Sequence, residues 1–382
     1  MSTSQSSRNH PRTDMRLPSS VSNARGCARR ATLLMLALLG MLTGAPPAIA
    51  GSPKILLYHH VATDTPASTS VTPDVFEAHL ALIEAAGYQV VPLTRIVDNL
   101  MSGGTLSSDW VAITFDDAYE SVLTEAAPRL AARKWPFTVF VSTDAVDAGS
   151  GPNLDWDGLR ALVARGATIA NHTMSHPHMI RRKPGEDTKA FEARLTREVI
   201  GAQDRLTREL NEPLRIVAYP YGEFDPAVAS LMQALGFAAL GQQSGPVGDT
   251  TNVHAIPRFP LATGFDSVAS LKEKLRTEHL PLLEPRVPAT VLAPDAVRPT
   301  LTLRTDGVAL NRARVNCFVD GSPTATISWQ DSETFQIRTE KPIRAGRSKY
   351  TCTAPYPDRP GSYYWHTHLF MKPHRDGSWY GG

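Results

Sequence analysis

The sequence predicts an α/β protein in which a parallel barrel of seven or eight β-α units precedes a small all-β module. Residues 54–278 alternate between strand-like and helix-like runs, and several strand-like runs are continuously apolar, as in Val111-Ala112-Ile113-Thr114-Phe115. Parallel strands that are buried on both faces have this character. After a proline-rich segment the helical pattern stops. The number of units fits a closed barrel better than an open sheet, although periodicity alone does not separate the two.

The elements of the barrel follow from hydrophobic periodicity. Strands are expected at residues 54–61, 88–93, 110–117, 137–143, 167–173, 215–220, 238–242 and 254–260. Helices are expected in the amphipathic segments 73–86, 94–101, 119–134, 157–165, 191–210, 226–235 and 266–277. In the segment 191–210, for example, Leu195, Val199 and Leu206 form one apolar stripe.

The first fifty residues have the three parts of a secretory signal. Arg25, Arg29 and Arg30 precede the uncharged run 31–43, and Ala48-Ile49-Ala50 follows it. That run is too short to span a membrane, which takes about 20 apolar residues. We therefore expect residues 1–50 to be a signal peptide, with translation starting at Met1 or Met15. The mature protein is expected to be periplasmic or extracellular, without a stable membrane span; an uncleaved anchor is the alternative.

The charge balance argues against nucleic acid as a partner. The chain has 39 basic and 37 acidic residues, but residues 1–50 alone contain six arginines and only one acidic residue. The remaining chain is therefore slightly acidic. A protein of this kind is a poor binder of phosphate backbones.

The part of the chain after the barrel has a different composition. We expect a barrel domain over residues 51–280, an extended linker with five prolines over 281–299, and a β module over 300–382. The module resembles a sandwich, with strands at 300–305, 314–319, 324–330, 335–339, 350–354 and 363–371. Aromatic residues near its end suit stacking against sugars, so the module is a candidate for carbohydrate interaction, although core packing explains most of them equally well.

The cysteines are interpreted through export. Cys27 would be lost with the signal, which leaves Cys317 and Cys352 in an oxidising compartment. An even pair there predicts a disulfide, which we expect to join the two sheets of the module. Two buried free thiols are the alternative.

Titratable residues follow several of the predicted barrel strands. Asp116-Asp117 follow the apolar run 111–115 of one strand, His172 and His176 come after the run 167–170 of another, and His59 stands at the end of the first strand. In a parallel barrel the carboxyl ends of the strands meet at the same face, where active sites form. One aspartate and two histidines can hold a divalent cation with a coordination position left for water, and the second aspartate can take the proton of that water.

Each motif alone is weak evidence. An Asp-Asp pair at a strand end often caps the following helix, and two histidines four residues apart are common. Their convergence on one face of a barrel, with His59 on a third strand, favours a catalytic site.

These residues also carry a family resemblance. Thr114-Phe115-Asp116-Asp117 and His172-Thr173-Met174-Ser175-His176-Pro177 resemble the first two motifs of the polysaccharide deacetylases, the NodB-homology or carbohydrate esterase 4 family. Leu57-Tyr58-His59-His60-Val61, Leu154-Asp155-Trp156 and Ala218-Tyr219-Pro220-Tyr221-Gly222 resemble the subgroup of periplasmic poly-N-acetylglucosamine deacetylases. The resemblance covers residues 54–260 and implies a distorted (β/α) barrel.

The resemblance implies a role for each matching residue. Asp116 would be the general base, and Asp117, His172 and His176 would bind the metal, with zinc as the expected ion and cobalt or nickel as alternatives. His59 would be the general acid, and the backbone N–H of Tyr221 would help to hold the oxyanion.

The chain departs from the family pattern at two places. Ala118 stands where the motif usually has glycine, which costs little unless the residue needs a positive φ. Many members have an arginine just before the Pro-Tyr motif that pairs with the catalytic aspartate, where this chain has Ala218-Tyr219. We expect Arg258 to reach that carboxylate instead; a surface salt bridge is the alternative.

Two aromatic residues are candidates for contact with the substrate. Trp156 and Tyr221 could form walls for a sugar ring, although Trp156 is equally well explained as a core aromatic. His178 is expected to face solvent.

The function that this sequence predicts is an exported, metal-dependent hydrolase of acetamide groups on an N-acetylated polysaccharide. The alternatives are a glycan-binding protein on a deacetylase scaffold, and a deacetylase of peptidoglycan or of O-acetylated xylan.

Overall fold

A computed structural model describes residues 51–149, 151–211, 213–283, 289–308, 310–322 and 325–381. The predicted signal peptide, residues 1–50, lies outside these ranges. Within them, none of the helices combines the length and the apolar character that crossing a membrane requires.

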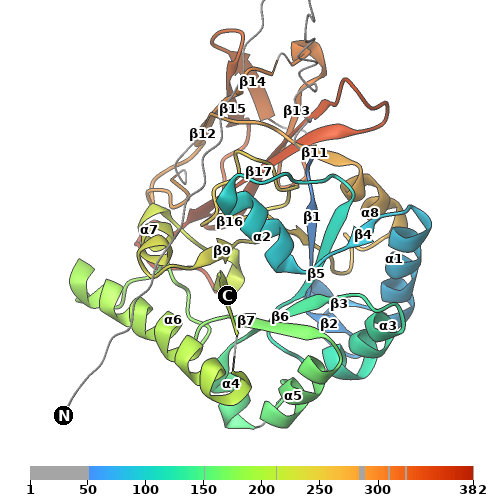
Figure 1. The fold of residues 1–382 in the computed structure, drawn as a ribbon. Helices are drawn as coiled ribbons and strands as arrows, with labels where there is room; N and C mark the ends of the chain where they lie inside the picture. Colours follow the sequence, from blue (N-terminus) through green and yellow to red (C-terminus); the bar gives the residue numbers. More distant parts are fainter. Residues whose placement is uncertain are drawn as a thin grey trace, which may run out of the picture. The chain divides into compact units, whose positions relative to one another are not determined.

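A curled parallel sheet forms the centre of the barrel, as predicted, and helices surround it (Figure 1). Its strands follow the order β10-β1-β5-β6-β7-β8-β9, with β4 paired to β5. Their bounds are β1 Lys54–Tyr58, β4 Gln89–Val90, β5 Trp110–Phe115, β6 Phe137–Val141, β7 Ala167–Asn171, β8 Leu214–Ala218, β9 Ala238–Leu240 and β10 Phe259–Pro260. A small parallel pair, β2 (His60–Val61) and β3 (Ser70–Val71), follows β1.

The segment 253–260 connects the two edges of this sheet. Ile256 forms a parallel bridge with Leu240 at the end of β9, and three residues later Phe259 of β10 pairs with Leu56 of β1. The first and last strands of the barrel are therefore neighbours, which brings residues near positions 59 and 258 to the same part of the fold.

Five of the eight α-helices in the described residues begin at a polar residue whose side chain caps them. Thr72, Asp155, Asp187, Asp225 and Ser267 each accept a hydrogen bond from a backbone N–H in the first turn of the helix that follows. The bounds are α1 Pro73–Ala85, α2 Leu93–Ser102, α3 Ala127–Ala132, α4 Thr143–Ala148, α5 Trp156–Ala164, α6 Thr188–Leu210, α7 Pro226–Ala234 and α8 Val268–Leu275. Helix α4 was not predicted, because six residues are too few to show a helical period.

The C-terminal module consists of two sheets around a common core. One has the order β11-β17-β16-β13 and the other β12-β15-β14. Apolar residues from both sheets, including Leu303, Phe335 and Tyr350, pack in one cluster. The strands are β11 Thr277–His279, β12 Thr300–Arg304, β13 Asn316–Val319, β14 Ala325–Trp329, β15 Thr334–Thr339, β16 Gly346–Pro355 and β17 Tyr363–Lys372.

The module also packs against the barrel. Leu369 and Met371 of β17 share an apolar cluster with Tyr219 and Phe224 of the barrel. Strand β11, which lies before the proline-rich segment, pairs with β17. Thr290, within that segment, donates a hydrogen bond to the backbone carbonyl of Phe224. The described residues on both sides of 284–288 therefore contribute to the contact between barrel and module.

The predicted disulfide between Cys317 and Cys352 is present, but its position in the module differs from the expectation. The two residues are direct partners on the antiparallel strands β13 and β16, with Cα atoms 4.1 Å apart. The bond therefore joins neighbouring strands of one sheet and does not join the two sheets. The expectation failed because strand pairing in the module depends on its register, which the spacing of the cysteines does not reveal.

Replacing both cysteines with alanine should lower the free energy of unfolding of the module by about 3 kcal/mol. The bond closes a loop between residues 35 apart in sequence and so restricts the unfolded chain. Urea unfolding followed by tryptophan fluorescence measures the difference. A reducing agent should destabilise the wild-type protein to the same level and leave the double variant unchanged. Equal stability of the double variant and the oxidised wild type would contradict the prediction.

Candidate active site

The register of the parallel strands brings the candidate residues to one end of the barrel. Tyr58 pairs with Phe115, and Val141 with Asn171, at the carboxyl ends of their strands. The next residues along these strands are His59, Asp116 and His172. Residues far apart in sequence thus meet because each one directly follows a strand of the same parallel sheet.

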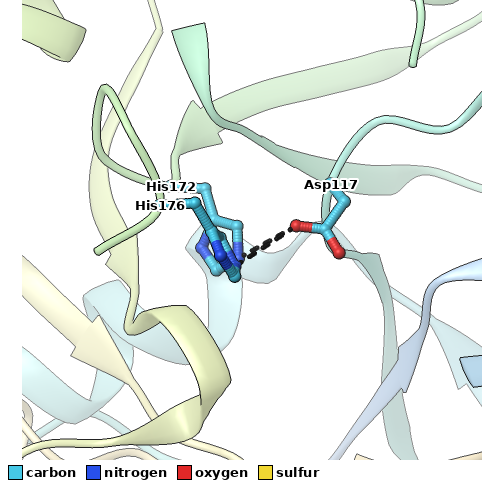
Figure 2. Close-up of side chains that lie close together, drawn as sticks. All are labelled: Asp117, His172 and His176. Carbon is cyan, nitrogen blue, oxygen red and sulfur yellow. Dashed lines mark ion pairs between the residues drawn. The ribbon is translucent and has the colours of Figure 1, made fainter. Parts of the chain in front are cut away.

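Asp117, His172 and His176 form a cluster of three possible metal ligands (Figure 2). The Nε2 atoms of His172 and His176 lie 3.4 and 3.5 Å from the same oxygen, Oδ1 of Asp117. Both distances exceed the usual N–H···O hydrogen-bond length of about 2.7–3.2 Å. They agree with the separation of roughly 3.4 Å expected for two ligands that bind one zinc ion at about 2.0–2.1 Å in tetrahedral geometry.

The hydrogen bonds of His172 prepare it for this role. Its Nδ1 lies 2.8 Å from the carbonyl oxygen of Ala218, which can only accept a hydrogen bond. Nδ1 therefore carries a proton, and in the neutral ring Nε2 presents a lone pair to Asp117. His172 is almost completely buried, so the orientation of the ring is fixed by its surroundings.

The second aspartate, Asp116, is paired with Arg258. The two terminal nitrogens of Arg258 donate to the two oxygens of Asp116 at 2.7 and 2.8 Å, and its Nε donates to the carbonyl of Gly241. Neither side chain of this ion pair is exposed to solvent. The structure thus places Arg258 on Asp116, in the arrangement anticipated from the sequence, and the expected surface alternative is absent at this position.

The electrostatic environment shifts the pKa values of the ionisable groups in the site. Burial raises the pKa of Asp116, but the positive charge of Arg258 outweighs it and leaves the pKa below its usual value. Burial likewise opposes ionisation of Asp117, yet the neighbouring histidines hold its pKa well below the usual range. Burial and the nearby His172 lower the pKa of His176 to about 4, so this imidazole is neutral at neutral pH. Both carboxylates and His176 are therefore in the protonation state that metal binding requires.

The pKa values of His172 and His59 shift in opposite directions. Burial lowers the pKa of His172, but the two aspartates outweigh that effect and raise it above its usual value. A proton and a cation would therefore compete for Nε2. His59 is half-buried and lines the cavity beside Asp117. Burial, as the largest influence, lowers its pKa, whereas the charges of Asp116 and Asp117 oppose the shift.

Tyr221 lies directly against the cluster, in the short helical turn Pro220–Gly222. Its ring packs edge-on against His176 and stacks on His178, with ring centroids 4.5 and 3.8 Å apart. His178 does not face solvent as expected: its Nδ1 lies 2.8 Å from the buried carboxylate of Glu223. Stacking on Tyr221 and the bond to Glu223 hold this imidazole in place, and it in turn supports one wall of the site.

Several residues of the site have a backbone conformation that is unfavourable for residues other than glycine. Positive φ angles occur at Asp117, Ala118, Thr173, His176 and Tyr221, five of the eight such non-glycine residues in the described ranges. Ala118 has a φ of 52°, so the alanine at this position is more costly than expected. Left-handed conformations cost about 1–2 kcal/mol per residue, and such strain is typical of functional sites.

The structure does not bring Trp156 to the site. Its indole N–H donates to Asp147, and the guanidinium of Arg205 lies 4.4 Å from the centre of its ring. These contacts with Asp147 of α4 and Arg205 of α6 fix the direction of the side chain.

A cavity of about 800 Å³ opens beside the cluster and contains residues that the sequence did not identify. Tyr119, Phe265, Arg347 and Lys349 line it together with His59, Asp117, His176 and Tyr221. Tyr119 is only two residues after Asp117, so its proximity was a signal that could have been used. Phe265 follows the last barrel strand, whereas Arg347 and Lys349 come from the module, and no local pattern connects them to the site.

Comparison with known proteins gives matches over the barrel. Residues 103–240 match the family model of polysaccharide deacetylases. A poly-beta-1,6-N-acetyl-D-glucosamine N-deacetylase of Staphylococcus aureus is 23% identical over 198 residues, which cover 50% of this chain and 68% of that protein.

Two solved structures share the fold of the barrel. The deacetylase PplD of Streptococcus pyogenes, solved in complex with acetate, aligns with a TM-score of 0.53 and 21% identity, over 59% of this chain and 99% of that one. IcaB from Ammonifex degensii aligns with a TM-score of 0.52 and 21% identity, over 58% and 98% of the two chains.

Proposed function

Since this chain contains a domain of the polysaccharide deacetylase family, we propose that it is a metal-dependent hydrolase that removes acetyl groups from the acetamide nitrogens of an N-acetylated polysaccharide. The observation that carries this proposal is the arrangement of three metal-ligand side chains next to an arginine-paired carboxylate at the edge of an open cavity. The relative from Staphylococcus aureus supports N-acetylglucosamine as the sugar.

The residues fit a divalent cation, and zinc suits them best. Asp117, His172 and His176 offer one oxygen and two nitrogen ligands, and the distances from the two histidine nitrogens to the aspartate oxygen match tetrahedral geometry. Cobalt or nickel can occupy a site of this kind as well. When bound, the ion polarises the acetyl carbonyl and lowers the pKa of water.

The remaining residues divide the proton transfers between them. Asp116, kept ionised by Arg258, takes the proton of the attacking water. His59 gives a proton to the amine that leaves. The backbone N–H of Tyr221 donates a hydrogen bond to the oxygen of the tetrahedral intermediate. The roles of His59 and Tyr221 rest on their positions in the lining of the cavity and on their match to the family motifs, and the role of the buried Asp116 rests on its motif and on its place next to Asp117.

Phe265 takes the place of Trp156 as the candidate sugar platform. Its side chain lines the cavity and is 69% exposed, which is unusual for a large apolar residue. Aromatic rings of this kind offer a flat apolar face to a sugar ring. Tyr221 offers a second aromatic ring in the lining of the cavity, and stacking on His178 holds that ring in place.

We also propose that the protein is exported to the periplasm or the extracellular space. The basic, apolar and A-x-A segments at the N-terminus support this, and so does the disulfide, because disulfides persist in oxidising compartments.

Acetate release tests the proposed activity. The chelated enzyme should be inactive, and added zinc should restore release from N-acetylglucosamine oligomers, with β-1,6 and β-1,4 linkages, peptidoglycan and acetylated xylan tested in parallel. The Asp116→Asn variant should still bind zinc but lose about a hundredfold or more in kcat, since it lacks the base. Full activity after exhaustive chelation would disprove the mechanism. Glycan binding without acetate release on any substrate would instead favour a binding protein.

A further inference from the structure

The module contributes positive charge to the cavity of the proposed active site. Arg347 and Lys349 lie two residues apart on β16 and therefore point to the same face of the strand, toward the cavity. Ser348 and Tyr350, which alternate with them, are buried in the opposite direction. One face of β16 thus packs inside the module, and the other face lines the cavity.

Lys349 has no ion-pair partner among the described residues, although its backbone N–H donates a hydrogen bond to the carboxylate of Asp320. Both Arg347 and Lys349 are exposed, and the ion pairs of the described chain include neither of them. Arg347 donates a hydrogen bond to the backbone carbonyl of Tyr221, so part of its donor capacity is used. Desolvation and the like charge of Arg347 lower the pKa of Lys349, while Asp320 opposes the shift.

The cavity has little negative charge with which to balance these cations. Asp117 is the only acidic side chain among the described residues that line it, and that carboxylate belongs to the metal cluster. The other carboxylate of the site, Asp116, is already neutralised by Arg258.

The positive charge continues beyond the cavity. A neighbouring depression of about 300 Å³ shares Arg347 and is also lined by Lys341 and Arg344, with Asp320 as its acidic residue. Residues 341–349 contain four basic residues and no acidic one. A chain of sugars that occupies the cavity and extends past Arg347 would therefore pass along a strip of cations.

A neutral N-acetylglucosamine homopolymer does not explain this arrangement. It has no anionic group for the cations to bind, and each deacetylation adds an amine that becomes positively charged and is repelled by them. A glycan with regularly placed acidic groups is complementary to the strip both before and after the reaction.

We propose that Arg347 and Lys349 form a subsite for an anionic group, a carboxylate or a phosphate, on a sugar close to the one that is deacetylated. The substrate class would then be an acidic N-acetylated polysaccharide. This inference rests on the proposed function, because it concerns the same cavity.

The ratio of kcat/KM for acidic and neutral oligosaccharides tests the subsite. The substrates are an N-acetylglucosamine oligomer, one in which N-acetylglucosamine alternates with a uronic acid, and one that carries phosphate. The wild-type enzyme should prefer a charged substrate, and the uronic acid and phosphate arms identify which anion it selects. In the Lys349→Glu variant the acidic-to-neutral ratio should fall roughly fivefold or more, mainly through KM. The Lys272→Glu variant, which changes an exposed lysine of α8, should keep the wild-type ratio.

A binding measurement separates failure of the subsite from failure of the enzyme assignment. Calorimetry with the metal-free Asp116→Asn protein should show tighter binding of a charged oligomer than of the neutral one, and Lys349→Glu should remove that difference. An unchanged ratio in Lys349→Glu, or a wild-type preference for the neutral oligomer, would overturn the subsite. Binding of a tetraglutamate peptide as tight as that of the acidic glycan would also overturn it. Absence of acetate release from every substrate, with charged oligomers still bound selectively, would reject the proposed activity alone.

Discussion

Replacing Arg258 with methionine should lower the free energy of unfolding by about 3–5 kcal/mol at neutral pH. The substitution leaves the carboxylate of Asp116 completely buried without the bidentate cation that now neutralises it. Urea unfolding measures the loss. The Arg338→Met variant, which removes an exposed arginine of β15, should change stability by less than about 0.5 kcal/mol.

The pH dependence of this loss identifies its cause. Arg258 holds the pKa of Asp116 below its usual value, and without it the raising effect of burial is opposed only by the charges of His172 and His59. A carboxyl group with a raised pKa in the folded state favours folding at low pH, and this contribution disappears as the pH rises through that pKa. The deficit of Arg258→Met should therefore be larger at about pH 7 than at about pH 5. The double variant Asp116→Asn/Arg258→Met should recover part of the stability, because it removes both charges of this buried ion pair. A deficit independent of pH and of residue 116 would show that Arg258 acts through packing.

Replacing His176 with glutamine should weaken zinc binding and lower kcat/KM for acetate release by at least about a hundredfold. The change removes the Nε2 ligand that lies 3.5 Å from Asp117, and His176 is less buried than His172, so the fold should tolerate the substitution better. Competition with a chromogenic chelator measures zinc affinity, and circular dichroism verifies the fold.

The His254→Gln variant is the matched control. His254 lies in the segment 253–260, which connects the two edges of the barrel sheet, and it is not among the residues of the metal cluster. It should retain zinc affinity and activity. Wild-type zinc affinity in His176→Gln would contradict the three-residue site, whereas loss of zinc without loss of acetate release would contradict the metal-dependent mechanism.

Much of the barrel could be predicted from the sequence, because its strands are marked by patterns of neighbouring residues. Continuous apolar runs such as Val111–Phe115 mark strands buried on both faces, and the carboxyl ends of parallel strands meet at one face. Asp116, Asp117 and the two histidines could thus be assigned to one place. The partner of Asp116 was predicted from the family resemblance: many members have an arginine just before the Pro-Tyr motif, this chain lacks it there, and Arg258 was available near the end of the last strand.

Features that depend on packing between distant elements could not be predicted in the same way. The direction of Trp156 depends on Arg205 of α6, and the sheet that contains the disulfide depends on pairing between β13 and β16. The approach of Arg347 and Lys349 to the cavity depends on how the module packs against the barrel, about which hydrophobic periodicity contains no information. The signal peptide and the catalytic role of each residue stay predictions.

The closure of the barrel by residues 253–260 has a consequence for how the protein is made. Synthesis proceeds from the amino end, so Asp116 emerges 142 residues before the arginine that neutralises it. Until that arginine arrives, the edge between β9 and β1 is incomplete and the carboxylate must stay in water, because burial without a counter-ion is too costly. The Asp116–Arg258 pair of the candidate active site can therefore form only after synthesis has passed residue 258.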